Sequence, residues 1–240
     1  MKRSTEIAQT VDDVSLKIKY RSFTLYVFLG GLFITALVSC NLIANKFVTV
    51  NLGFYTFVLS AGVLPYPITF LITDILSEIY GRSKTNTVVL VGFVASLFVL
   101  LILWMGGLFD SIPNSPVNNS NYDTVFQNSW RVILASMIAY LIAQLIDVRM
   151  YHFWKRLTKG KKLWLRNNAS TVVSQLVDTT LVVIVLFIGR EDAETMGGYI
   201  RDGWAFKAIC ALVDTIFIYL IVGFIRKSFQ LKIGQEVDFL

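Results

Sequence analysis

The stretch TVVLVGFVASLFVLLILWMGGLF occupies positions 87–109 and contains no charged residue. A hydrocarbon core about 30 Å thick is crossed by roughly 20 apolar residues in a helix, so this stretch is long enough to span a bilayer. The rest of the chain agrees, because 55% of its 240 residues are hydrophobic and only 16% are charged. An average soluble domain has roughly 25% charged residues. The sequence therefore predicts an integral membrane protein.

Five further stretches meet or approach the same length, and we expect an all-α, polytopic fold with six transmembrane helices. The second stretch contains Pro65 and Pro67, which break or kink a helix. It therefore forms either two half-helices or one helix that runs from near Pro65 to Tyr80. The five stretches are 23–44, 54–73, 132–148, 169–188 and 204–225.

The distribution of positive charge predicts the orientation. Lys and Arg concentrate in cytoplasmic loops. With the N-terminus inside, the inside segments hold 17 of the 22 Lys and Arg residues, and the 149–167 loop alone holds seven. We therefore expect both termini in the cytoplasm, with a tail at 1–22, a six-helix transporter domain at 23–225 and a second tail at 226–240. The same placement explains the net charge of +6 without nucleic acid as a partner.

Several classes of protein are disfavoured by what the sequence lacks. Its two cysteines, Cys40 and Cys210, lie in apolar stretches, and its one histidine, His152, cannot form a multi-histidine metal centre. There is no G-x-x-x-x-G-K-[ST], H-E-x-x-H or G-x-S-x-G motif. We expect neither an enzyme, nor a cofactor, nor a metal site.

Polar and ionisable residues inside the predicted spans are the candidates for function. A charged side chain at the centre of a membrane helix costs about 2.5–3.5 kcal/mol on insertion scales and usually faces a cavity or a partner. The alternative is that such residues only hold helices together. Asp74 and Glu78 could also be an interfacial pair in contact with water or with Arg82, and Asp147 could pair with Arg149 or Arg166. The candidate binding residues are Asn45, Phe70, Asp74, Glu78, Gln144, Asp147, Arg166, Asn168, Gln175 and Asp178.

Carboxylates and carboxamides dominate this set, and together they offer many acceptors and some N–H donors. A carboxylate can accept two hydrogen bonds from an amino-imino edge, and a carboxamide can both donate and accept. Aromatic side chains such as Tyr66 and Phe70 can stack on a ring. The set therefore suits a planar heterocycle, such as a purine-like base.

Three stretches resemble the queuosine precursor transporter family, also called the putative vitamin uptake transporter family. In the first, at 60–85, the chain has G-x-x-x-x-P-x-x-F-x-x-T-D-x-x-x-E-x-Y-G, and in the second, at 143–179, it has W-L-R-N-N-x-S-T-x-x-S-Q-x-x-D-T. A third similar stretch is NLIANKFVTV at 41–50. The resemblance implies six transmembrane helices and import of 7-cyano-7-deazaguanine or 7-aminomethyl-7-deazaguanine. The matched positions include Asp74, Glu78, Tyr80, Gly81, Trp164, Arg166, Asn167, Asn168, Ser170, Gln175 and Asp178.

We therefore expect a small-molecule importer of a bacterial inner membrane that works by alternating access. The base is expected between the second, fourth and fifth spans, where Asp178 or Glu78 accepts from its N–H groups. Gln175, Asn168 or Gln144 would face its carbonyl, and Arg166 would gate the cytoplasmic side. Proton coupling through a carboxylate and facilitated diffusion both fit.

Other functions stay open at this stage. The chain could be the substrate-binding subunit of an ATP-driven importer, because small residues at Gly31, Thr35 and Ser39 let a partner helix approach the first span. A homodimer is a further possibility, and a membrane enzyme or scaffold is the third alternative.

Overall fold

The computed structural model describes residues 2–44, 46–53, 55–127, 130–189 and 191–237. The chain is mostly helical, so the predicted helical class is confirmed, and a two-stranded antiparallel hairpin is added to it. In chain order the elements are α1 (Lys2–Leu42), β1 (Phe47–Asn51), β2 (Thr56–Ser60), the 3-10 turn η1 (Ala61–Val63), α2 (Tyr66–Ile79), α3 (Gly81–Gly106), α4 (Asn119–Tyr122), the π-helical turn η2 (Asp123–Gln127), α5 (Trp130–Leu157), α6 (Leu163–Phe187) and α7 (Ala193–Phe229).

Within the described residues, five helical stretches are long and apolar enough to cross a membrane. This confirms a multi-pass membrane protein. The predicted span at 132–148 lies within α5, which has 28 residues but is not among the five. The five stretches are Leu16–Leu42, Ala61–Ile79, Gly81–Gly106, Leu163–Val185 and Ala193–Phe229.

The predicted helix at 54–73 is wrong in its first half. The strands Phe47–Asn51 and Thr56–Ser60 form the β1–β2 hairpin, in which Phe47 pairs with Ser60 and Asn51 with Thr56. Gly53 has a φ of +86°, which glycine adopts without the strain that a side chain causes. The alternative expectation of one helix from near Pro65 is confirmed, because α2 begins at Tyr66 with Pro65 as its N-cap.

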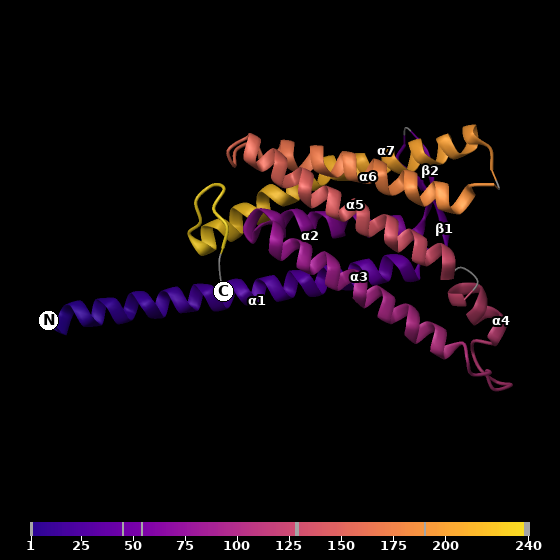
Figure 1. Ribbon diagram of the computed structural model, residues 1–240, viewed down its shortest axis with the longest axis horizontal. Coiled ribbons are helices and arrows are strands. Elements are labelled where there is room, and N and C mark those ends of the chain that lie inside the picture. The colour runs from indigo at the N-terminus through magenta and orange to yellow at the C-terminus, as the bar shows by residue number, and fades with distance from the viewer. Residues whose placement is uncertain (1, 45, 54, 128–129, 190, 238–240) are drawn as a thin grey trace.

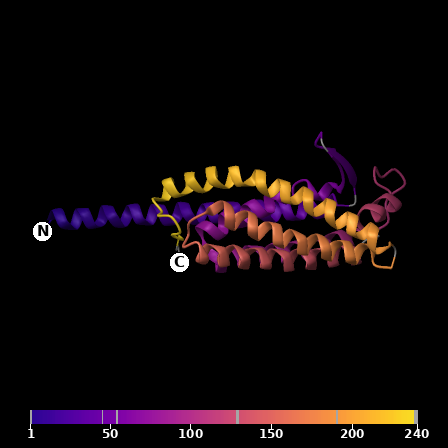
Figure 2. The ribbon, with the colours of Figure 1, turned by 90° about the horizontal axis from the view of Figure 1, so that it is seen from above.

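Helix α2 is the centre of the bundle. It contacts α1, α3, α5 and α7, while α5 packs along α6 and α6 along α7. Ten of its residues are buried, a run that includes Asp74 and Glu78. Figures 1 and 2 show the long helices roughly aligned, with the N-terminal part of α1 projecting beyond the others. A short central helix therefore presents its polar side chains to the helices that surround it.

The two ends of the bundle differ. At one, called the hairpin end, the β1–β2 hairpin packs on α7 through Phe57 and Phe206, whose ring centroids lie 5.5 Å apart (Figure 1). At the other, called the C-terminal end, the segment after α7 folds back over the junction of α2 and α3. There the Val237 N–H donates to the Ile79 carbonyl at 2.7 Å, and Lys84 Nζ donates to the Val237 carbonyl at 3.1 Å.

Close packing of α1 uses glycine on its neighbours. A Cβ built on Gly92 of α3 would lie 2.7 Å from Cε1 of the fully buried Phe33, and one on Gly62 would clash with the backbone carbonyl oxygen of Cys40 in α1. By contrast, Gly31 and Thr35 point outward from α1. The apolar side chains on the outer faces of α3 and α7, such as Phe98 and Phe224, are exposed as in a surface that meets lipid.

Candidate functional site

A row of buried polar side chains runs between α2, α5 and α6, and we call it the polar seam. Each helix contributes residues at spacings of three or four, which places them on one helical face. The members are Thr73, Asp74, Ser77 and Glu78 of α2, Tyr140, Gln144, Asp147 and Tyr151 of α5, and Arg166, Ser170, Thr171, Ser174, Gln175 and Asp178 of α6. All are buried, so the seam meets no solvent in this conformation.

The Asp178 region lies towards the hairpin end and contains an ion pair with α7. Lys207 Nζ lies 2.6 Å from Asp178 Oδ2, with 8% and 3% of the two side chains exposed. The same ammonium lies 4.4 Å from the centroid of the Tyr66 ring, an attractive position over an aromatic face. Asp178 Oδ1 and both amide atoms of Gln175 have no hydrogen-bond partner among the described residues. Buried polar atoms are normally paired, so these three atoms are exceptions to the usual pairing.

Aromatic rings line the same region. The ring centroid of Tyr66 lies 5.5 Å from that of Phe70 and 5.4 Å from that of Tyr140, and Phe70 and Tyr140 are 6.4 Å apart. Such rings offer apolar faces beside the free polar atoms of Gln175 and Asp178.

The middle of the seam holds two carboxyl groups close to each other. Asp74 of α2 and Asp147 of α5 are near enough to interact. Ser174 donates to Asp147 Oδ1 at 2.9 Å, whereas Asp74 Oδ1 has no partner among the described residues. Gln144 donates to the Tyr140 hydroxyl at 2.8 Å. This part of the seam therefore links α2, α5 and α6 through polar contacts.

The C-terminal end of the seam is closed by an ion cluster around Glu78. Its Oε1 atom pairs with Arg166 Nη2 at 2.6 Å and with Arg226 of α7. Its Oε2 atom accepts from the Tyr151 hydroxyl at 3.0 Å and lies 3.9 Å from Lys155 Nζ. Both Glu78 and Arg166 are fully buried. Four helices are thus joined through one carboxylate.

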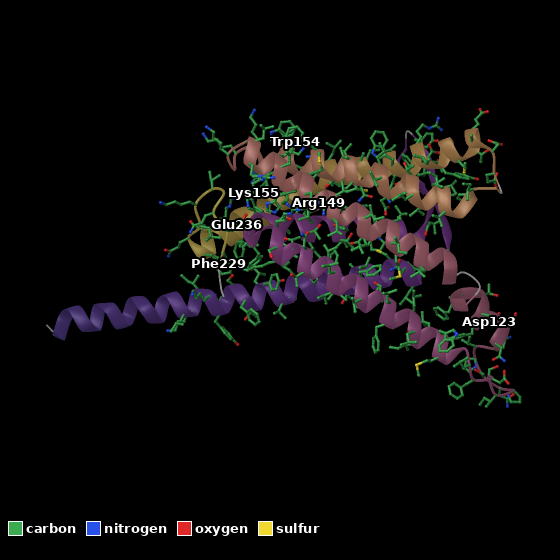
Figure 3. All side chains as sticks on the ribbon, in the orientation of Figure 1. Asp123, Arg149, Trp154, Lys155, Phe229 and Glu236 are labelled. Carbon is green, nitrogen blue, oxygen red and sulfur yellow. The ribbon has the colours of Figure 1, made fainter. Side chains whose placement is uncertain are left out.

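The C-terminal segment is joined to this cluster. Lys155 Nζ lies 2.9 Å from Glu236 Oε1, and Figure 3 shows both side chains where α5 ends and the C-terminal segment folds back. Lys155 Nζ also donates to the carbonyls of Ser77 and Glu78, at 3.3 and 3.2 Å. The end of the bundle is therefore held shut by charges from α2, α5, α6, α7 and the segment after α7.

Residues 60–221 match the family described as "Putative vitamin uptake transporter". The chain belongs to this family. The family consists of transporters and not of enzymes, in agreement with the prediction that the chain is no enzyme. It also agrees with the family resemblance that the two sequence motifs indicated.

Curated proteins similar to this chain carry consistent names. A "Probable queuosine precursor transporter" of Bacillus subtilis is 29% identical over 177 residues, which are 73% of this chain and 77% of that protein. The "Queuosine precursor transporter" of Escherichia coli is 26% identical over 71% of this chain and 69% of its own length. A "Probable queuosine precursor transporter" of Haemophilus influenzae is 23% identical over 73% of this chain and 74% of its own length. No solved structure matches the chain.

In this member of the vitamin uptake transporter family, eight of the ten candidate residues lie in the polar seam or, like Phe70, beside it. Asn45 lies outside the described residues. Asn168 faces α7 instead, where its amide donates to Thr215 Oγ1 at 2.6 Å. Neither alternative ion pair is formed among the described residues, because Glu78 pairs with Arg166 rather than Arg82, and Asp147 accepts from Ser174.

The sequence reasoning missed the cations that neutralise the two best candidates. Lys207 and Arg226 both come from α7, and Lys155 comes from the last turn of α5. Lys207 is the single positive charge inside the predicted span at 204–225. Its position within an apolar stretch is the sequence signal that could have identified it as a partner for a buried carboxylate. Arg226 and Lys155 lie in segments whose basic residues predict a cytoplasmic location. Only the fold shows that these two also pair with Glu78. In the described part of the chain, no group of three or more metal-binding side chains occurs.

Proposed function

We propose that this chain imports a queuosine precursor, a 7-deazaguanine base, across the bacterial inner membrane. The family and the names of the curated relatives support this substrate class. The observation that carries the proposal is the pair of buried, unpartnered groups on α6, the Asp178 carboxylate oxygen and the Gln175 amide, beside three aromatic rings.

The proposed contacts follow from the chemistry of these groups. Gln175 and Asp178 are three residues apart on α6 and therefore share a face. Asp178 Oδ1 has two lone pairs, which accept from the ring N–H and the exocyclic amino group of the base. The Gln175 amide N–H donates to the carbonyl of the base. Tyr66, Phe70 and Tyr140 pack on the ring, which can be 7-cyano-7-deazaguanine or 7-aminomethyl-7-deazaguanine.

Lys207 is the positioning residue of this site. It holds Asp178 Oδ2 at 2.6 Å and so leaves Oδ1 directed to the base. Burying a charge is costly unless it is paired, so the Lys207 ammonium supplies the counter-charge for the buried Asp178 carboxylate.

Glu78, Arg166 and Arg226 form the proposed inner gate. Breaking this cluster opens the C-terminal end, and re-forming it closes that end. A buried ion cluster is well suited to a gate because it has two discrete states, formed and broken. Glu78 and Arg166 are thus assigned to gating, and Gln144, Asp74 and Asp147 to the passage between the gate and the base.

The proposed topology has six spans, in which α5 is added to the five stretches given above. At about 1.5 Å per residue, its 28 residues reach roughly 42 Å, enough to cross a bilayer. The basic loop at 149–167 lies at the C-terminal end, which we place in the cytoplasm together with both termini. The tails at 1–22 and 226–240 then flank a transmembrane domain at 23–225.

Uptake of radiolabelled 7-cyano-7-deazaguanine into proteoliposomes that contain only this protein tests the proposal. Saturable uptake supports a lone transporter, and a dependence on an imposed pH gradient adds proton coupling. Tight binding in detergent without uptake indicates a missing partner, such as an ATPase subunit. If the protein shows no uptake and no binding of this base, the assigned substrate is wrong.

A further inference from the structure

A cavity of about 250 Å³ lies at the C-terminal end of the bundle, between the start of α6 and the last turns of α7. A water molecule takes up roughly 30 Å³ in the liquid, so the cavity has room for a group much larger than one water. Its polar wall comes from the loop between α5 and α6 and from α7. The residues that matter are Lys161, Lys162, Arg166, Tyr219, Gly223 and Arg226.

Positive charge exceeds negative charge around this cavity. Four of its lining side chains are cationic, and the carboxylate that reaches two of them, Arg166 and Arg226, is the single group of Glu78. Among the described residues, neither Lys161 nor Lys162 has a carboxylate within ion-pair distance. The Arg226 Nε atom is buried and has no hydrogen-bond partner in the same part of the chain. The cavity is therefore suited to an anion.

The loop that carries the lysines is held in a fixed shape. Arg166 Nη1 donates to the carbonyls of Gly160 and Lys161, at 2.9 and 3.0 Å. Lys162 has a φ of +57°, a backbone conformation rare for residues with a side chain. Such a conformation persists where the surrounding contacts enforce it. The backbone that carries the two lysines is thus held at the edge of the cavity.

The surroundings of the cavity are those of a membrane interface. Tyr219 and Trp164 are about half exposed beside it, and Leu220 and Phe224 are the exposed apolar side chains next along α7. Aromatic residues with one polar atom are enriched where headgroups meet acyl chains. The Tyr219 hydroxyl accepts from the backbone N–H of Trp164 at 3.2 Å, which joins the two helices at this level. An anion with attached hydrocarbon chains therefore fits better than a free ion.

We propose that this cavity binds the phosphate headgroup of an anionic phospholipid, with Lys161, Lys162 and Arg226 around the phosphate and the acyl chains along the outer face of α7. Basic pockets between transmembrane helices bind such headgroups in membrane proteins. The bound lipid would join α6 to α7 next to the Glu78 cluster. The cavity shares Arg166 with the polar seam, but the proposed phosphate contacts come from Lys161, Lys162 and Arg226, so the proposal does not depend on which base is transported.

The test measures binding of short-chain phosphatidylglycerol to the full chain in detergent, by native mass spectrometry. Phosphatidylcholine with the same chains and inorganic phosphate serve as the comparison probes. We expect phosphatidylglycerol to bind at least tenfold more tightly than either. Equal binding of the two lipids overturns the proposal, and binding of inorganic phosphate as tight as that of phosphatidylglycerol overturns the assignment to a lipid.

Two variants separate this site from general attraction to a basic surface. Lys161→Ala with Lys162→Ala removes two charges from the cavity, whereas Arg156→Ala with Lys227→Ala removes two exposed charges from the same end of the bundle. Gly223→Leu fills the cavity without changing a charge, and a Cβ at Gly223 meets nothing within 4 Å. We expect the first and third variants to lose at least tenfold in phosphatidylglycerol binding and the second to lose less than threefold. An equal loss in the control pair, or no loss in Gly223→Leu, overturns the proposal.

Discussion

The Nζ atom of Lys207 in α7 lies 2.6 Å from Oδ2 of Asp178 in α6, and both side chains are almost completely buried. Taking two charges out of water is expensive, and a well-packed apolar pair of similar size is often equally stable or more so. Stability alone is therefore a weak reason for this pair. The free second oxygen of Asp178, beside the free amide of Gln175, supplies a functional reason.

Removing one partner of this ion pair is expected to destabilise the protein. Removing both partners is expected to restore most of the stability that either single variant loses. Asp178→Asn or Lys207→Met leaves one buried charge unpaired, which costs about 3–5 kcal/mol. The double variant has no unpaired charge, so it recovers stability but not uptake. Thermal unfolding in detergent and uptake into proteoliposomes measure the two effects.

The matched control is the exposed pair of Arg201 and Asp202, whose atoms lie 3.1 Å apart. Removing it with Arg201→Gln and Asp202→Asn is expected to change the free energy of unfolding by less than about 1 kcal/mol. If the Asp178 and Lys207 single variants are as stable as this control variant, Asp178 and Lys207 do not form a buried ion pair.

Gln175→Ala is expected to weaken binding of the base without harming the fold. Both amide atoms of Gln175 are buried and unpartnered, so the substitution removes desolvated polar groups and no internal hydrogen bond. The free energy of unfolding should stay the same or rise, while the Kd for the base should rise roughly 10- to 100-fold for about 1.5–3 kcal/mol lost.

Gln144→Ala provides the contrast, because Gln144 donates to the Tyr140 hydroxyl and accepts from Thr73. Its removal should lower the free energy of unfolding by about 1–3 kcal/mol. A Gln175→Ala protein that unfolds as readily as Gln144→Ala would mean that Gln175 has a structural role.

Glu78→Gln is expected to open the C-terminal end. The carboxylate holds the fully buried Arg166 at 2.6 Å, and its loss leaves two arginines without their shared counter-charge. We expect a loss of about 3–5 kcal/mol in the free energy of unfolding and faster alkylation, by a membrane-impermeant maleimide, of a cysteine introduced at Ser174.

Glu236→Gln is the milder counterpart, because Glu236 is 44% exposed on its side chain. Its loss should cost less than about 1 kcal/mol and change the alkylation rate little. Equal alkylation rates in the unmodified protein and in Glu78→Gln would argue against a gate at this cluster.

Gly92→Ala and Gly31→Ala are expected to act in opposite directions. A Cβ at Gly92 would lie 2.7 Å from the Phe33 ring, whereas one at Gly31 meets nothing within 4 Å. Overpacking of this kind costs about 1–3 kcal/mol, and replacing an open helical glycine with alanine gains up to about 1 kcal/mol. Thermal unfolding of both variants tests the contact between α1 and α3. We expect the unfolding midpoint of Gly92→Ala to be lower than that of the unmodified protein.

The helical class and most of the long apolar helices could be read from the sequence, because long apolar stretches have few other ways to fold. The hairpin was missed because Phe54 to Thr73 is also apolar, and apolarity outweighed the β-branched residues Val48, Thr49, Val50, Thr56 and Val58 on either side of Gly53. The start of α2 followed from its two prolines, because their effect on the backbone is local.

The partners within the site were harder to predict than its members. Asp178 and Glu78 stand out as charges in apolar sequence, but their cations lie far along the chain, at Lys207 and Arg226. Such pairings depend on how α7 packs against α2 and α6. Asn168 belongs to the motif that contains the other candidates of α6. Its position along the helix, however, places its side chain against Thr215 of α7.

The most direct test of the central claim compares two bases, 7-cyano-7-deazaguanine and its analogue without the exocyclic amino group. If Asp178 accepts from that amino group, the unmodified protein should bind the full base roughly 10- to 100-fold more tightly, as expected for one hydrogen bond to a charged acceptor. In the protein with Asp178→Leu and Lys207→Met, which has no side-chain acceptor at position 178, the two Kd values should become nearly equal. Equal Kd values in the unmodified protein, or a preference that survives in the double variant, would contradict the assignment of Asp178 to the base.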